Sequence, residues 1–261
     1  MTDINETKQG GSAADARSSL WIRRFHPSPE RRMRLLCLPH AGGAAPAFHA
    51  LSKVLSPDIE VLAVQYPGRQ DRRDEPMTDD VASLADGIVR ALTPWTSEPF
   101  AVFGHSMGAV VGFEVVRRLE RQGVRPVALF ASGRRAPGRY RPDRVHLLDD
   151  AGLVEEIRSL DGTDTRVFDN EELLSLVLPV IRGDYRAIET YTCPPDAVVD
   201  CPTEVLVGET DSHVTRAEAL AWGEHTTAGA EVTYFPGGHF YLSEQFEGVT
   251  RVVRERLAVH A

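Results

Sequence analysis

Cysteine is scarce in this sequence, which contains only Cys37, Cys193 and Cys201 in 261 residues. Such a small, odd number provides no disulfide framework and is typical of a reducing compartment. The sequence also has no run of about 18 apolar residues that could span a bilayer. Its polar first 19 residues lack the apolar segment of a secretion signal. These absences predict a cytoplasmic protein with no membrane association.

Basic residues are outnumbered, with 29 Lys and Arg against 38 Asp and Glu and a net charge of −9. A general nucleic-acid-binding protein is normally basic, so we expect no nucleic-acid partner. No Cys or His stands beside Cys193 and Cys201 to complete a metal-ligand pattern, and we expect no metal. We interpret Cys37 as a buried residue of a strand, because free cysteine behaves as a small hydrophobe.

Apolar residues make up 42% of the chain, which is enough for one large α/β domain. We assign this domain to residues 18–261 and expect residues 1–17 to form a disordered tail. Short apolar runs alternate with stretches of helical periodicity, and this predicts a mostly parallel central sheet flanked by helices. The expected strands are 33–38, 59–64, 100–103, 127–131, 203–207 and 231–235, with 21–25 as a candidate antiparallel edge. The expected helices are 79–92, 107–121 and 242–257.

The alternation of strands and helices breaks between about residues 138 and 200. This insertion is expected to contain helices at 151–160 and 170–190. The second helix is apolar almost all round, which is more than one buried face needs, and Pro179 is expected to kink it. The residues alone leave two interpretations open, an ordinary core helix or part of a lid over an apolar pocket.

The motif GHSMG at residues 104–108 has the form G-x-S-x-G. It follows the expected strand at 100–103 and precedes the expected helix at 107–121, which is the context that a nucleophile on a sharp strand-to-helix turn requires. Such a turn exposes the serine Oγ above the carboxyl ends of the strands, beside the positive end of the helix. We therefore predict Ser106 as a catalytic nucleophile and interpret His105 as a spacer packed beside it.

A serine hydroxyl needs a general base, and candidates follow the last two expected strands. His239 comes just after the strand at 231–235, and Asp211 comes just after the strand at 203–207. Both therefore belong to the carboxyl edge of the sheet, and the chain order Ser, Asp, His is that of α/β-hydrolases. We predict His239 as the base and Asp211 as the acid that orients it. The competitors are His213 for the base and Glu209 and Asp184 for the acid.

Acyl transfer also needs two N–H donors for the developing oxyanion. One is expected from the backbone of Met107, the residue after the nucleophile, and the other from the loop after an early strand. The segment 39–44 fits that loop, because its small side chains let the backbone approach a substrate. We predict the N–H of Ala41 as the second donor; the alternative is that the glycine pair at 42–43 forms only a turn.

Together these motifs resemble the type II thioesterases of polyketide and nonribosomal peptide biosynthesis, which belong to the α/β-hydrolase superfamily. The resemblance covers about residues 20–257 and implies an α/β-hydrolase fold with an inserted helical lid at about 138–200. It is carried by LPHAGG at 38–43, QYPGR at 65–69, GHSMG at 104–108, DYR at 184–186, GETD at 208–211 and GGHF at 237–240. By this motif match the nucleophile falls on Ser106, the acid on Asp211, the base on His239 and the oxyanion donors on Ala41 and Met107.

The resemblance also implies a substrate class. Type II thioesterases hydrolyse acyl groups from the phosphopantetheine arm of acyl or peptidyl carrier proteins, and so edit or unload an assembly line. The phosphopantetheine belongs to the carrier-protein substrate, so no cofactor is expected. We expect carrier proteins as partners and a monomeric enzyme. The alternatives are a carboxylesterase or an acyltransferase with the same triad acting on small soluble substrates, and a non-catalytic relative used for binding.

Carrier proteins are generally acidic, so a basic docking face is expected despite the negative net charge. The first candidate cluster stands just before the inserted helices and comprises Arg134, Arg135, Arg139, Arg141 and Arg144. The second cluster comprises Arg69, Arg72 and Arg73 and is diluted by Asp71, Asp74 and Glu75. The alternative for both clusters is an ordinary solvated surface.

Overall fold

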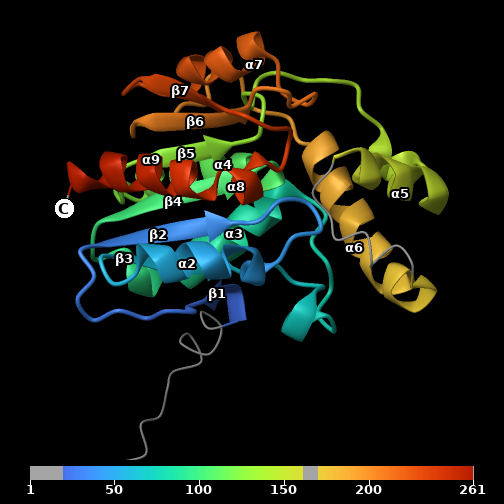
Figure 1. Cartoon of the computed structure of the whole chain (residues 1–261), viewed down its shortest axis with the longest axis horizontal. Coiled ribbons are helices and arrows are strands. Elements are labelled where there is room, and N and C mark those ends of the chain that lie inside the picture. The colour runs from blue at the N-terminus through green and yellow to red at the C-terminus, as the bar shows by residue number, and fades with distance from the viewer. Residues whose placement is uncertain (1–19, 161–169, 261) are drawn as a thin grey trace, which may run out of the picture.

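A seven-stranded sheet runs through the centre of the computed structural model, which describes residues 20–160 and 170–260 (Figure 1). Its strand order is β1-β3-β2-β4-β5-β6-β7, with β1 antiparallel to β3 and all other neighbours parallel. The strands are β1 (Ile22–Arg23), β2 (Met33–Leu38), β3 (Ile59–Val64), β4 (Phe100–His105), β5 (Leu129–Ser132), β6 (Thr203–Gly208) and β7 (Ala230–Phe235). The predicted parallel sheet and its antiparallel edge are therefore confirmed.

Helices cover both faces of the sheet. One face packs against α3 (Val81–Leu92) and α4 (Met107–Arg121), and the other against α2 (His49–Leu55) and α9 (Phe246–Ala258) (Figure 1). Successive strand residues point to opposite faces, so Leu36 belongs to the first core and its neighbour Cys37 to the second. The burial of Cys37 inside a strand is thus confirmed.

The last helical stretch differs from the single helix expected at 242–257. The structure has a short helix α8 (Tyr241–Glu244), and α9 begins only at Phe246. The break lies at Gln245, whose φ of −102° and ψ of 27° depart from helical values. Tyr241 is fully buried and its hydroxyl lies 2.6 Å from Ser132 Oγ, so α8 is held against the sheet.

Two helices of the expected insertion lie between β5 and β6 in the chain, beyond the carboxyl ends of the strands (Figure 1). They are α5 (Asp150–Ser159) and α6 (Glu171–Glu189). The side chains of Asp149 and Asn170 accept hydrogen bonds from the first N–H groups of α5 and α6, which fixes where each helix starts. The short helix α7 (Arg216–Leu220) follows β6.

The excess of apolar residues on α6 is divided between a buried and an exposed side. Leu178 and Ile181 pack with Leu153 of α5, whereas Leu173 and Leu176 are exposed. The helix continues through Pro179 as one element. No helix among the described residues is both long and apolar enough to cross a membrane. The predicted tail at 1–17 lies outside the described residues.

Candidate active site

Ser106 stands on a sharp turn between β4 and α4. Its φ of 54° and ψ of −116° lie outside the regions that most residues adopt. The flanking glycines leave the chain room to turn, because a Cβ on Gly104 would lie 2.0 Å from Gly108 O and a Cβ on Gly108 would lie 2.2 Å from Leu38 O. The Ser106 N–H donates to Ser132 O of the next strand at 2.8 Å. The backbone is therefore held in a conformation that the serine alone would not favour.

The structure brings the two other predicted residues to this serine. His239 Nε2 lies 3.0 Å from Ser106 Oγ, and His239 Nδ1 lies 2.9 Å from Asp211 Oδ2. The loops that carry Asp211 and His239 are joined by a hydrogen bond from Thr210 N–H to Gly237 O at 3.0 Å. The three side chains thus form a continuous line of hydrogen-bonding groups at the carboxyl edge of the sheet.

The carboxylate of Asp211 is buried and held from two sides. Its second oxygen, Oδ1, accepts the backbone N–H of His213 at 2.9 Å. The His213 ring lies 5.3 Å from the His239 ring, but the acid that His213 approaches is Glu156, at 4.0 Å. Glu209 is exposed. Geometry therefore favours Asp211 and His239 over these two competitors.

Two further histidines surround the site and are kept neutral. Burial, followed by the positive charges of His239 and Arg69, lowers the pKa of His40 to about 4. Burial also lowers the pKa of His105 well below its usual value. The Nδ1 atom of His105 lies 2.9 Å from Ser132 Oγ, and its ring packs 5.2 Å from that of His239. His105 is therefore the packed neighbour of the nucleophile that the sequence predicted.

Ser132 and Tyr241 support this packing and were not predicted from the sequence. Ser132 Oγ lies between His105 Nδ1 and the Tyr241 hydroxyl, and Ser132 O holds the N–H of Ser106. Ser132 ends β5 beside His105 in the sheet register. A serine at the carboxyl end of a strand next to the nucleophile strand was the only sequence signal for it.

The predicted oxyanion donors are Met107 and Ala41. They belong to two backbone segments that meet where Gly108 of α4 packs against Leu38 and Pro39. Met107 is the first residue of α4, so its N–H has no partner inside the helix. In the part of the chain that the structure describes, neither this N–H nor that of Ala41 has a hydrogen-bond acceptor. The segment 40–43 is a turn, closed by Gly43 N–H to His40 O at 2.9 Å with Gly42 at φ +75°. The glycine pair therefore does form a turn, and that turn presents Ala41 beside the start of α4.

Comparison with known proteins places this geometry in a family. Residues 33–258 match the family model of the thioesterase domain. The chain belongs to the thioesterase family. It is 49% identical to thioesterase PikA5 of Streptomyces venezuelae over 93% of this chain and 87% of that protein. It is 46% identical to a probable cadicidin biosynthesis thioesterase of Streptomyces griseus over 94% of this chain and 68% of that protein.

Solved structures agree with this assignment. The type II thioesterase BorB from the borrelidin biosynthetic cluster shares 47% identity, with a TM-score of 0.86 over 91% of this chain and 98% of that one. The resemblance to type II thioesterases of polyketide and nonribosomal peptide clusters is therefore confirmed, as is a hydrolase of the α/β type. The described residues of the thioesterase hold no group of three or more His, Cys, Asp or Glu arranged to bind a metal ion.

A buried ion pair joins the oxyanion loop of the thioesterase to α6. Asp184, which is 1% exposed, accepts two hydrogen bonds from the Arg69 guanidinium, at 2.6 and 2.7 Å. The same carboxylate accepts the Gly42 N–H at 2.7 Å, and Arg69 also donates to Gly43 O at 3.1 Å. Asp184 therefore does not compete with Asp211 as the acid; it clamps the loop that carries Ala41. Arg69 belongs to the QYPGR motif and Asp184 to the DYR motif, but the sequence did not show that the two residues are in contact.

This ion pair corrects one of the expected docking clusters. Arg69 is buried, and so is Arg72, which donates to Gln65 O at 2.7 Å and to the Glu75 carboxylate. Of the three arginines only Arg73 is exposed, at 80% of its side chain. The prediction of a basic docking face at Arg69 and Arg72 is therefore wrong, because both guanidinium groups are used inside the protein.

Replacing Asp184 by Leu leaves the buried guanidinium of Arg69 without its counterion. We expect the free energy of unfolding to fall by about 3 to 5 kcal/mol. We also expect kcat for a small soluble thioester to fall by about 10- to 100-fold, because the loop carrying Ala41 loses its anchor. Urea unfolding and steady-state turnover measure the two effects.

A double variant, Arg69→Met with Asp184→Leu, separates stability from loop position. It removes both charges, so most of the stability should return, since apolar residues replace a buried ion pair at little cost. Turnover should stay low because the Gly42 N–H still lacks its acceptor. A double variant with wild-type kcat would contradict the clamp.

The low pKa of His40 predicts a pH effect on stability. The unfolded chain binds a proton at this residue below a pH of about 6.5, whereas the folded protein does so only below about 4. In this window the unfolded state binds more protons, so the free energy of unfolding should decrease as the pH falls. Urea unfolding between these pH values should show that the free energy of unfolding depends less steeply on pH in His40→Gln than in the wild type. An unchanged slope would contradict the assignment.

Proposed function

We propose that this thioesterase hydrolyses acyl groups from the phosphopantetheine arm of acyl or peptidyl carrier proteins, and so edits or unloads a polyketide or nonribosomal peptide assembly line. The observation that carries the proposal is the line from Ser106 through His239 to Asp211, in a chain 49% identical to thioesterase PikA5. Relatives from borrelidin, prodiginine and yersiniabactin pathways support the substrate class.

In the proposed first half-reaction, Ser106 Oγ attacks the thioester carbonyl and its proton passes to His239 Nε2. The carbonyl oxygen gains negative charge and accepts the N–H groups of Met107 and Ala41. The C–S bond then breaks, and His239 returns the proton to the sulfur, so the carrier leaves as a free thiol. An acyl ester on Ser106 remains.

In the second half-reaction, water replaces the thiol. His239 takes a proton from water as its oxygen attacks the ester, and the same oxyanion donors act again. The C–O bond to Ser106 breaks, Oγ recovers the proton from His239, and the acyl group leaves as a carboxylic acid. Asp211 holds the imidazole with Nε2 toward Ser106 and stabilises the imidazolium that forms in each half. The reaction as proposed uses no metal or cofactor beyond the arm of its substrate.

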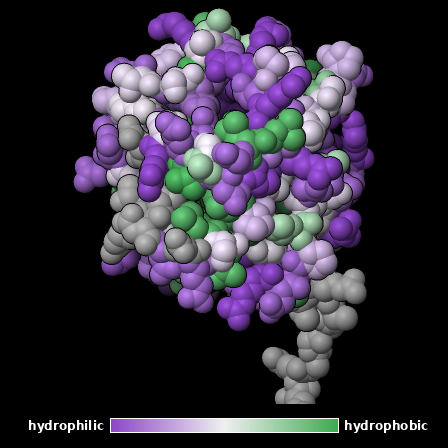
Figure 2. Space-filling view, turned by 90° about the vertical axis from the view of Figure 1, so that its right-hand side faces the viewer, coloured by the Kyte–Doolittle hydropathy of each residue, from purple (hydrophilic) through white to green (hydrophobic). Residues whose placement is uncertain are grey.

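The inserted helices are proposed to act as a lid. A groove of about 930 Å³ lies between Gly42 of the oxyanion loop and the exposed Leu173 and Leu176 of α6. Its apolar wall suits an acyl chain or the pantetheine arm. Figure 2 shows apolar residues gathered in a band among hydrophilic ones on the face of the molecule that carries these helices. We propose that a single copy of the thioesterase, in the cytoplasm, presents this face to the carrier protein.

Time-resolved mass spectrometry of an acyl-loaded carrier protein tests the proposal. The wild-type enzyme should remove the acyl mass, whereas Ser106→Ala should leave the carrier loaded. Asp211→Asn should slow removal by about 10⁴-fold, because the imidazole loses the partner that sets its tautomer. Ser83→Ala, at an exposed serine of α3, serves as the matched control and should act as the wild type does.

Other outcomes contradict the proposal in defined ways. If the carrier stays loaded while small oxygen esters are cleaved, the carrier-protein role falls and a carboxylesterase remains. If the acyl group appears on an added alcohol or amine instead of as free acid, the enzyme is an acyltransferase.

A further inference from the structure

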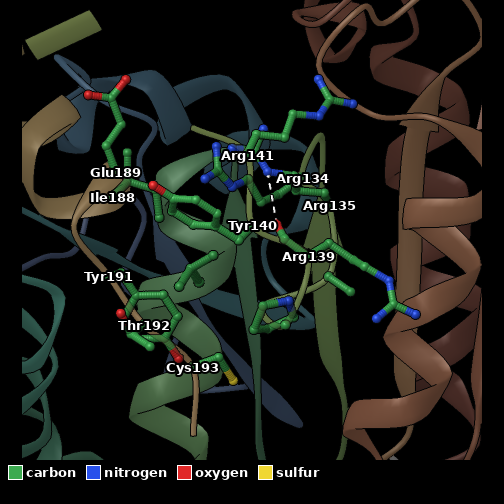
Figure 3. Close-up of a pocket in the computed structure, with 14 residues that line it drawn as sticks. Arg134, Arg135, Arg139, Tyr140, Arg141, Ile188, Glu189, Tyr191, Thr192 and Cys193 are labelled. Carbon is green, nitrogen blue, oxygen red and sulfur yellow. Dashed lines mark hydrogen bonds between the residues drawn. The ribbon is translucent and has the colours of Figure 1, made fainter. Parts of the chain in front are cut away.

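A cavity of about 330 Å³ lies between the loop after β5 and the end of α6. Residues 134–141 form one side, and Ile188, Glu189 and the segment 191–193 form the other (Figure 3). Val110 of α4 also lines it. Four arginines of the 134–141 loop stand at this cavity, which makes it the most densely cationic hollow among those described.

Three of the four arginines are paired with carboxylates of the same chain. Arg135 donates to Asp143 at 2.7 Å, Arg141 pairs with Glu218 at 2.5 Å, and Arg139 pairs with Glu224. Figure 3 shows Arg139 and Arg141 extending away from the centre of the cavity. The expected docking cluster on this loop therefore includes arginines that already have partners in the chain, and it stays a prediction.

Arg134 is the exception. In the part of the chain that the structure describes, its guanidinium has neither an ion pair nor a hydrogen-bond acceptor, and its Nε atom is buried without a partner. Burial, and then the neighbouring charge of Arg135, lower the pKa of Arg134 to about 9, so it stays protonated at neutral pH. Arg134 as a whole is half-buried, but an unpaired cation with a buried Nε atom is costly for a fold, which favours a partner from outside the chain.

The nearby carboxylates do not fill this role. Both oxygens of Glu189 are occupied by the backbone N–H groups of Val145 and His146 and by the His146 ring. Asp143 is bound to Arg135. Both carboxylates act on Arg134 only through space, by raising its pKa, and neither provides an acceptor atom to its guanidinium.

The cavity lies close to the nucleophile. Arg134 follows Ser132, the residue whose carbonyl holds the Ser106 N–H, by two positions. Val110 lies one helical turn beyond Ser106, or about 6 Å along α4. Arg134 also helps to lower the pKa of His213, after burial, and the His213 ring is 5.3 Å from that of His239. Arg134 and its cavity therefore neighbour Ser132 and His213, residues that themselves lie beside Ser106 and His239.

We propose that Arg134 binds an anionic oxygen group of the acyl-carrier substrate in this cavity. A guanidinium forms paired, planar hydrogen bonds with carboxylate and phosphate alike. The group is either a carboxylate on the acyl chain or the phosphodiester of the pantetheine arm. The apolar side chains of Val110 and Ile188 beside it suit the carbon chain that leads to either one. This inference rests on the proposed function and adds a substrate preference to it.

Three matched soluble thioesters test the proposal: acetyl-pantetheine, malonyl-pantetheine and acetyl-phosphopantetheine. Only the second has an acyl carboxylate, and only the third has a phosphate. Arg134→Gln should raise KM by about 10- to 100-fold for one anionic substrate, and leave acetyl-pantetheine unchanged. A selective loss with malonyl-pantetheine assigns the site to an acyl carboxylate, and one with acetyl-phosphopantetheine assigns it to the arm.

Arg139→Gln is the matched control, because Arg139 lies on the same loop but is paired with Glu224. It should leave all three KM values near those of the wild type. Arg134→Gln should also keep or raise the melting temperature, since it removes an uncompensated charge, while the Arg134 carbonyl still accepts the Trp222 indole N–H at 2.8 Å. Equal loss with all three substrates, or no loss with any, would overturn the proposal.

A binding measurement keeps this test separate from the proposed function. A wild-type enzyme that hydrolyses none of the thioesters would contradict the proposed function. The anion site would then be tested by titrating the protein with malonate and with inorganic phosphate, using tryptophan fluorescence to detect binding. Binding of either ion that is lost in Arg134→Gln and kept in Arg139→Gln supports the anion site. Equal binding by both variants, or none by the wild type, overturns it.

Discussion

The turn at Ser106 is the constraint on which the active site depends. A serine at φ 54° persists only where its surroundings determine it, and here α4 packs so closely on β2 that Gly108 has no space for a side chain. The Ser106 N–H is bound to Ser132 of β5 on the other side. The position of the nucleophile is therefore set by the packing of α4 on β2 and by the hydrogen bond to β5, before any substrate arrives.

The triad partners and the oxyanion loop are positioned beside this turn in two different ways. Asp211 and His239 follow parallel strands, so their loops emerge at the same edge of the sheet and are joined there through Thr210 and Gly237. The oxyanion loop instead depends on the insertion, because Asp184 of α6 holds both Arg69 and the Gly42 N–H. A movement of α6 would thus change the backbone that faces the substrate carbonyl, which links the proposed lid to the chemistry.

Most charged groups near the site have a partner within the protein. Arg69 and Arg72 form ion pairs with Asp184 and Glu75. The arginines of the 134–141 loop are also paired, apart from Arg134. His40 and His105 remain neutral beside the triad, so they add no positive charge next to His239 at neutral pH. Such an environment leaves Asp211 as the charged partner in direct contact with the catalytic imidazole.

Much of this arrangement could be predicted from the sequence, because strands buried on both faces read as short apolar runs and the triad residues stand at their ends. The sequence could not tell that Arg69 meets Asp184, since 115 positions separate them and exposed and buried arginines look alike in a chain. For the same reason the sequence could not tell which arginines of the 134–141 loop are paired with Asp143, Glu218 and Glu224. The break at Gln245 was not predicted. Tyr241 of α8 contacts Ser132, and a contact between residues so far apart in the sequence leaves no local pattern.

Covalent labelling with a fluorophosphonate, followed by peptide mapping, tests whether Ser106 is an activated nucleophile. We expect one rapid modification, on Ser106, which disappears in Ser106→Ala and slows strongly in His239→Ala, while denatured protein is not labelled. Wild-type protein that stays unlabelled, or is labelled on another residue, would contradict an activated nucleophile at this turn.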